Sequence, residues 1–139
     1  MPKPPLPPEA DGMLRKPNPA VIATLRKDGS PHTAATWYDW DGSRVLVNMD
    51  ESRLRLGNIR HDPRVCMTVM DGSSWYRQLT VYGRVVEIFD DTDLAAIDRL
   101  SLRYTRQLFG NRNAKRVSAY IELDGWYGWE GSTHWPPPD

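Results

Sequence analysis

The chain has little of several features that would assign it to a specialised class of protein. It contains one cysteine, Cys66, in 139 residues, so no disulfide can form within the chain. Its 18 basic residues balance its 18 acidic residues, which gives the whole chain no electrostatic reason to bind nucleic acid or a membrane surface. No apolar run approaches the roughly 20 residues that cross a bilayer, and the first residues lack the apolar centre of a signal peptide. We therefore expect a cytoplasmic protein without a nucleic-acid or membrane partner.

The residue patterns of several enzyme classes are also missing. His32, His61 and His134 do not have the spacing of metal ligands, and no second cysteine lies near Cys66, so no metal site is predicted. Neither common glycine-rich nucleotide loop is present. The apolar run RVCMTVM around Cys66 favours a buried, inert thiol over a nucleophile. The sequence assigns no residue a catalytic role.

Proline marks the two ends of the predicted domain. Residues 1–12 contain five prolines, which predicts a flexible, extended arm. The segment over residues 131–139 ends in HWPPPD and is predicted to be a frayed tail. No repeat or linker interrupts the chain between them, so we expect one domain over residues 13–130.

Short runs rich in β-branched and aromatic residues alternate with turn signals along this domain. AVIATLR and PHTAATWYDW flank a KDGS turn, and a DGS turn then leads into RVLVNM. RVCMTVM and WYRQLTVYGRVVEIF flank a DGSS turn, and Gly83 within the second run predicts a bulge or a tight bend. RVSAYIELDGWYGWE supplies one or two closing strands. Six or seven antiparallel strands predict a mainly β protein, a closed or partly closed barrel, because closure hides sheet edges.

Two helices are predicted between the strands. DDTDLAAIDRLSLRYTRQL spaces Leu94, Ile97, Leu100 and Tyr104 at helical intervals behind an acidic start that would cap the helix. ESRLRLGNIR, over residues 51–60, forms the other helix and is followed by a proline stop.

The shorter helix carries Arg53 and Arg55 in its first turn, and two interpretations of them remain open. In one, Arg55 forms a surface pair with Glu51 four residues earlier. In the other, Ser52, Arg53 and Arg55 surround an anion, because a helix start offers free N–H groups and arginine matches phosphate oxygens.

Several motifs follow one another in a particular order: ATLRKDGSPH, the aromatic segment TWYDWDG, the basic string from Arg53 to DPRV, and LTVYGRV. Together, over about residues 20–90, they resemble the pyridoxamine-phosphate-oxidase-like split-barrel proteins. They are most similar to the actinobacterial branch of flavin and deazaflavin oxidoreductases. RVSAYIELDGWYGW gives weaker support in the closing strands.

The resemblance implies a six-stranded antiparallel split barrel that forms a homodimer, with FMN or the deazaflavin coenzyme F420 in a groove between subunits. The cofactor phosphate would lie against the helix after the third strand, held by Ser52, Arg53 and Arg55. The second and third strands would line the ring system through Ala35, Thr36, Trp37, Asn48 and Met49. Residues of the partner subunit would approach the cofactor, namely Trp75, Tyr76 and Gln78. The proline-rich arm would replace the N-terminal helix of the family.

The implied function is hydride transfer from a reduced cofactor to a small conjugated organic acceptor. The lack of a nucleophile or an acid–base pair agrees with this, because in cofactor enzymes the cofactor carries the hydride chemistry. F420 is favoured over FMN because the resemblance to that branch and the arginine-rich, lysine-poor composition both suggest an actinobacterial source. The alternatives are an FMN-binding oxidoreductase, a non-catalytic flavin- or deazaflavin-binding protein, and a dimeric scaffold with an empty groove. A pyridoxamine-phosphate oxidase proper is less favoured because the chain is short.

Overall fold

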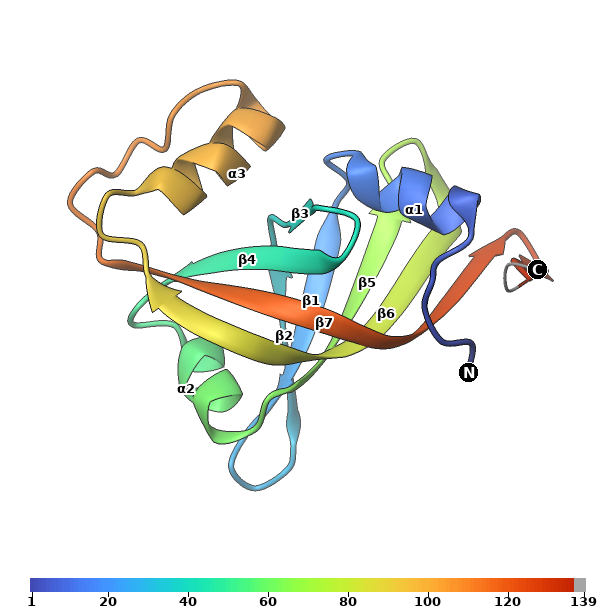
Figure 1. The fold of residues 1–139 in the computed structure, drawn as a ribbon, viewed down its shortest axis with the longest axis horizontal. Helices are drawn as coiled ribbons and strands as arrows, with labels where there is room; N and C mark the ends of the chain where they lie inside the picture. The colour runs from blue at the N-terminus through green and yellow to red at the C-terminus, as the bar shows by residue number, and fades with distance from the viewer. Residues whose placement is uncertain (137–139) are drawn as a thin grey trace.

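One antiparallel sheet and three helices form the computed structural model, which describes residues 1–136 (Figure 1). The strand order in the sheet is β2-β1-β5-β6-β7-β4-β3, and β8 pairs with β7. The strands are β1 (Ala20–Leu25), β2 (Pro31–Thr36), β3 (Asp39–Trp40), β4 (Arg44–Asp50), β5 (Arg64–Asp71), β6 (Ser74–Asp90), β7 (Arg116–Glu130) and β8 (Thr133–His134). The helices are α1 (Pro8–Arg15), α2 (Leu54–His61) and α3 (Ala95–Thr105).

The mainly β prediction is confirmed, but the expectation of six strands is wrong, because the sheet has eight strands within residues 1–136. The predicted strand over residues 31–40 is divided into β2 and the two-residue β3, and β8 is a second two-residue strand. Residues 37–38 carry the chain from β2, at one end of the strand order, to β3, at the other. The two ends of the sheet therefore come near each other there without pairing among the described residues, and the barrel is only partly closed.

Helix α1 contradicts the predicted extended arm over residues 1–12. Pro8 is its first helical residue, a position where a missing N–H removes no hydrogen bond within the helix. Ala10, Met13 and Leu14 then follow at helical spacing and are buried in the core. The expected replacement of an N-terminal helix by an arm is therefore wrong, because the prolines concealed a short amphipathic pattern.

The first residues of the chain run beside β7 (Figure 1). The Trp126 backbone N–H donates to the Pro2 carbonyl oxygen at 3.0 Å. The division into a domain over residues 13–130 and a tail over 131–139 stays a prediction, and residues 137–139 of that tail lie outside the described residues.

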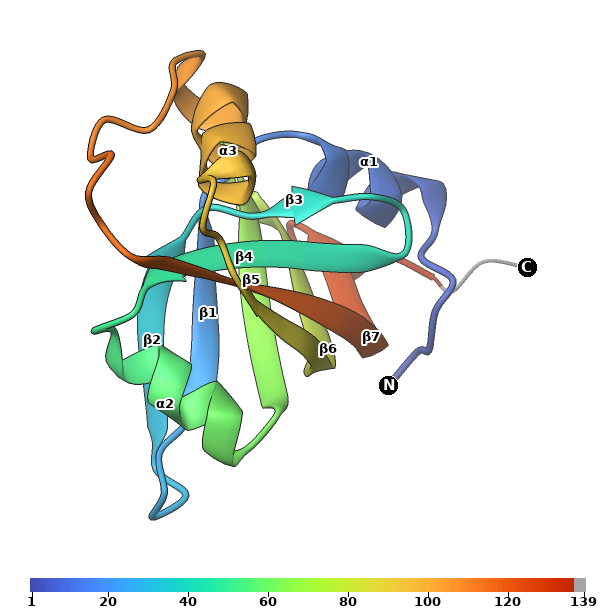
Figure 2. The ribbon, with the colours of Figure 1, turned by 60° about the vertical axis from the view of Figure 1, so that its left-hand side comes forward.

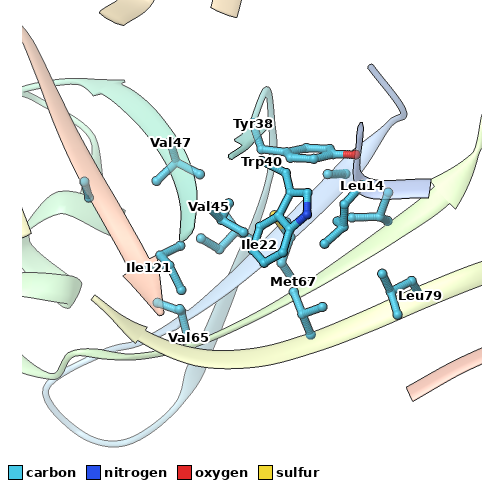
Figure 3. Close-up of a cluster of buried hydrophobic side chains, with 14 of the residues drawn as sticks. Leu14, Ile22, Tyr38, Trp40, Val45, Val47, Val65, Met67, Leu79 and Ile121 are labelled. Carbon is cyan, nitrogen blue, oxygen red and sulfur yellow. The ribbon is translucent and has the colours of Figure 1, made fainter. Parts of the chain in front are cut away.

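The interior of the barrel is filled by apolar side chains from nearly every strand and from α1 (Figure 3). Tyr38, Val45 and Leu79 are fully buried, and Trp126 from β7 is buried as completely. Alternation along β5 and β6 sends one set of side chains inward and leaves the next set on the outer face. Burial of this cluster supplies the main stabilisation that holds the strands around the site.

Helices α1 and α3 lie at one end of the barrel, whereas α2 lies toward the other end (Figures 1 and 2). The predicted apolar face of α3 is confirmed, because Ile97 and Leu100 are buried. Helix α2 begins at Leu54, later than the sequence predicted, since residues 51–53 form a turn. No helix of residues 1–136 is long and apolar enough to cross a membrane.

The predicted irregularity at Gly83 is confirmed, and it makes a sharp test of the fold. The pairing of β6 with β7 shifts register between Tyr82 and Gly83. A Cβ atom at residue 83 would collide with the Glu122 carbonyl oxygen on β7.

We expect Gly83→Ala to destabilise the protein by about 1–3 kcal/mol, measured by denaturant unfolding. Gly57→Ala is the matched control, because a Cβ there meets nothing within 4 Å and should stabilise α2 by about 0.5–1 kcal/mol. Equal stability of the two variants would contradict the bulge.

Candidate functional site

A groove with a volume of about 550 Å³ lies between the β2 and β4 strands and helix α3. This volume is within the range of pockets that hold small molecules and cofactors. The groove is lined by Pro17, Pro19, Ala20, Ala35, Thr36, Trp37, Asn48, Arg55, Ile97, Leu100, Tyr104, Phe109 and Arg116.

One wall of the groove is aromatic and apolar. Trp37 stacks on Tyr104 with ring centroids 5.5 Å apart and an interplanar angle of 11°. Phe109 meets Trp37 edge-on at 6.5 Å. The buried Ile97 and Leu100 side chains of α3 continue this wall. Such a surface suits one face of a flat, conjugated ring and excludes water from it.

Basic side chains lie where the groove meets a second cavity of about 380 Å³. The two cavities share Ala35, Arg55 and Arg116, and the second also contacts Arg53 and His32. Among the described residues, none of these three arginines forms an ion pair with a carboxylate. The junction of the cavities therefore carries three guanidinium groups against one carboxylate, that of Asp50, and this excess of positive charge favours an anionic ligand.

The Arg55 guanidinium is half-buried and is held by neutral acceptors. Its Nη1 donates to the Ala35 carbonyl oxygen at 3.3 Å and its Nη2 to the Asn48 carbonyl oxygen at 3.0 Å. Its Nε is buried and has no hydrogen-bond partner among residues 1–136. Burial, and then the charges of Arg53 and Arg116, lower the pKa of Arg55. Arginine remains charged at neutral pH even so.

The surface pair between Glu51 and Arg55, one of the two interpretations left open by the sequence, is not formed. Glu51 instead lies 3.4 Å from the Lys115 ammonium nitrogen. Arg55 instead joins the Ala35 and Asn48 carbonyl oxygens, a role that neither interpretation included, and an anion at the start of α2 stays a prediction.

A buried network behind the groove orients Arg116. The Asn48 amide nitrogen donates to Asp91 Oδ2 at 3.2 Å and to Ser118 Oγ at 2.7 Å, while its oxygen accepts from Arg116 Nε at 2.9 Å. Asp91 also accepts hydrogen bonds from two backbone N–H groups in the first turn of α3. The start of α3 is thus tied to Arg116 through one amide side chain.

The structure brings together five of the predicted site residues on the groove wall, namely Ala35, Thr36, Trp37, Asn48 and Arg55. Arg53 lines only the adjoining cavity. Ser52 is exposed, and its hydroxyl donates to Asp50 Oδ1 at 2.7 Å. Met49 is 1% exposed and packs in the core, away from the groove wall.

The other three predicted residues lie on or near the β5–β6 hairpin. Trp75 and Tyr76 are 77% and 73% exposed and line a third cavity, of about 530 Å³. Pro19 lines both this cavity and the groove, so the two are neighbours. Gln78 is half-buried on β6. Within one chain these residues do not line the groove, and their approach from a partner subunit stays a prediction.

Sequence reasoning missed Arg116 and the contribution of α3 to the wall. The helical spacing of Ile97, Leu100 and Tyr104 was visible, but nothing local shows that this helix faces the groove. Arg116 reaches the site because β7 pairs with β4, which places Arg116 opposite Asp50. The only signal available was an arginine at the start of a predicted strand.

Tyr104 connects α3 to the segment 17–19 of the groove, and this contact predicts a dependence of stability on pH. Its hydroxyl donates to the Asn18 carbonyl oxygen at 2.7 Å, and burial raises the pKa of Tyr104 to about 12. In the unfolded chain a tyrosine loses its proton near pH 10 (an approximate value). The folded state holds this proton more tightly, so its contribution to stability is complete below about pH 10 and is lost as the pH rises to about 12.

Denaturant unfolding at several alkaline pH values measures this loss. Tyr104→Phe should lose less stability over that pH interval than the wild type does, because its side chain has no proton to lose. Tyr76→Phe, which alters an exposed tyrosine, should follow the wild type. Identical pH profiles for Tyr104→Phe and the wild type would contradict the assignment.

Comparisons with known proteins agree with this arrangement of elements. A family model described as pyridoxamine 5'-phosphate oxidase matches residues 6–130. The F420H2-dependent biliverdin reductase of Mycobacterium tuberculosis is 27% identical over 118 residues, which cover 76% of this chain and 74% of that protein. A solved structure described as an F420 reductase is 31% identical, with a TM-score of 0.80, over 87% of this chain and 98% of the other. A conserved hypothetical protein from M. tuberculosis shares the fold at 22% identity, with a TM-score of 0.73, over 99% of this chain and 94% of the other.

Proposed function

The chain belongs to the pyridoxamine 5'-phosphate oxidase family, and from this premise we propose that it is an oxidoreductase that transfers hydride from reduced F420 to a small conjugated organic acceptor. Two relatives support the choice of cofactor, since one is named an F420H2-dependent biliverdin reductase and the other an F420 reductase. The first name also supports an extended conjugated molecule as the acceptor class.

One observation carries the proposal: a groove with an aromatic wall ends at three arginines that form no ion pair among the described residues. A cofactor with a flat ring and a phosphate group needs both surfaces at once. The buried, unpartnered Nε of Arg55 and the exposed Arg53 beside it fit a phosphate, because guanidinium groups match its oxygens. The residues present therefore fit F420.

When bound, F420 supplies the hydride, and the protein contributes binding and orientation. Arg53 and Arg55 would hold the phosphate at the start of α2. Trp37 and the α3 wall would pack against the ring and exclude water. Exclusion of water strengthens the electrostatic attraction between the arginines and the phosphate.

FMN is the alternative cofactor, because its phosphate would suit the same arginines and the resemblance to flavin oxidoreductases also implies it. A non-catalytic binding protein is the other alternative. Turnover of bound, reduced cofactor with an artificial electron acceptor separates an enzyme from a carrier.

We further propose that the protein is a homodimer in which the groove lies beside the interface. A row of paired positions crosses the outer face from β1 through β5 and β6 to β7, and it consists of Val21, Thr68, Thr80 and Tyr127. Val21 is 45% exposed and Tyr127 is 42% exposed, so the outer face presents apolar area. The same row continues to Ala35 on the edge of the groove. A second copy on this face would bring its residues to the cofactor.

Titration with each cofactor tests the proposed function. Fluorescence quenching at matched salt should give a lower Kd for F420 than for FMN. Raising the salt concentration should weaken both complexes, because the attraction includes exposed arginine charge. Equal affinities, or tighter binding of FMN, would favour the FMN alternative.

Two variants locate the phosphate in the same assay. Arg53→Ala removes an exposed charge that makes no side-chain hydrogen bond among the described residues, so it should weaken F420 binding by about tenfold or more without lowering the Tm. Arg60→Ala is the matched control, since Arg60 lies at the other end of α2 and lines none of the cavities described. An unchanged Kd in Arg53→Ala would place the phosphate elsewhere.

Light scattering at micromolar protein tests the dimer. We expect twice the mass of one 15.9 kDa chain. Val21→Lys, on the outer face, should shift the protein toward the monomer, because it places a charge in a desolvated contact. A wild-type protein with the mass of a single chain would refute the shared site.

A further inference from the structure

We propose that Arg116 is a third ligand for the anionic group of the cofactor, contributed by β7 rather than by the helix start, and that Asn48 is the positioning residue that aims it. The proposal rests on the proposed function and deepens it, because it assigns the anion a contact that no motif near α2 supplies.

The contacts of Arg116 leave its terminal nitrogens available to a ligand. Only its Nε is used, as a donor to Asn48 Oδ1 at 2.9 Å. Its guanidinium carbon lies 4.8 Å from the centroid of the Phe109 ring, which restricts the plane of the group. Among residues 1–136, Nη1 and Nη2 donate to no protein acceptor. Arg116 lines both the groove and the adjoining cavity, so its side chain lies where the two cavities meet.

Two acidic side chains lie near Arg116. Asp50 and Asp91 are both close enough to raise the pKa of Arg116, although burial lowers it more strongly. Neither carboxylate forms an ion pair with Arg116. Asp50 Oδ1 instead accepts from the Ser52 N–H and hydroxyl, and Asp91 accepts from the first turn of α3.

Asn48 explains how the guanidinium is oriented without an ion pair to either acid. Its amide lies between Asp91 and Arg116, donating to the first at 3.2 Å and accepting from the second at 2.9 Å. The opposite amide orientation would set a carbonyl oxygen against the Asp91 carboxylate, so these neighbours dictate which way the amide points. A carboxylate in place of this amide would neutralise Arg116, whereas the amide fixes its direction only. The backbone oxygen of Asn48 also accepts from Arg55 Nη2 at 3.0 Å, so one residue aligns two arginines.

Arg116→Gln tests the assignment, with Arg60→Gln as the control that makes the same change in net charge. We expect the Kd for F420 to rise by about 10- to 150-fold in Arg116→Gln, the range for loss of a hydrogen bond to a charged group. Arg60→Gln should bind as the wild type does. Wild-type affinity in Arg116→Gln overturns the inference while leaving the proposed function intact.

A double-mutant cycle tests the positioning role of Asn48. If Asn48 acts through Arg116, Asn48→Ala should raise the Kd in the wild type and change it little in the Arg116→Gln background. A residue that contacts the cofactor itself, or that only supports the fold, would cause the same loss in both backgrounds, and that result would overturn the role. Ser118→Ala removes one partner of the same amide and replaces Asn48→Ala in the cycle if the latter does not fold.

Inorganic phosphate separates this inference from the identity of the cofactor. Sodium phosphate should raise the Tm of the wild type and of Arg60→Gln above the Tm in sodium chloride of equal ionic strength. It should raise the Tm of Arg116→Gln much less. This result in a protein that does not bind F420 would support the anion site and refute the proposed cofactor. The same phosphate-induced rise in Arg116→Gln and in the wild type would count against Arg116 as a ligand.

Discussion

The barrel is open between β2 and β4, and the Arg55 guanidinium bridges this opening. It donates to the Ala35 carbonyl on β2 and to the Asn48 carbonyl on β4. β2 is the last strand at one end of the sheet, and β3 covers β4 only at residues 45–46, so both oxygens belong to unpaired edges. The carbonyl groups of an unpaired strand edge need hydrogen-bond donors from elsewhere in the protein. A planar guanidinium supplies two donors in fixed geometry, which a lysine ammonium does not.

This bridge has an electrostatic consequence for the site. Because Arg55 is held by neutral carbonyl groups, its charge is not cancelled, and Arg53 and Arg116 add two more positive charges beside it. Their mutual repulsion raises the free energy of the folded state without ligand. An anion at this position relieves the repulsion, and its binding energy then adds to the stability of the folded protein. The opening in the barrel and the candidate anion site are thus one feature of the molecule.

The wall of the groove depends on a second arginine, which holds α3 in place. Arg103 donates to the carbonyl oxygens of Leu14, Arg15, Lys16 and Tyr38 at distances of 2.7–2.9 Å. Three of these carbonyls lie at or just after the C-terminal end of α1. The last carbonyl groups of a helix have no N–H donors within the helix, so they are free to accept from Arg103. Helix α1 therefore does more than close the core, because its end provides the anchor for the helix that lines the groove.

Local signals in the sequence predicted the features that depend on local geometry, namely the bulge at Gly83 and the buried face of α3. The site depends on which donors and acceptors long-range pairing brings together, and no short window contains that information. Ser52 illustrates this limit of local prediction. The helix start was assigned there, but the Ser52 N–H and hydroxyl donate to Asp50 Oδ1 in a turn, and α2 begins only at Leu54. The resemblance pointed to β2, β4 and α2, all of which contribute residues to the groove, whereas hydrogen bonding decides how each arginine is used. Arg55 donates through both terminal nitrogens to the two strand edges, whereas Arg116 donates only through Nε among the described residues. Both terminal nitrogens of Arg116 therefore remain available as hydrogen-bond donors in the groove.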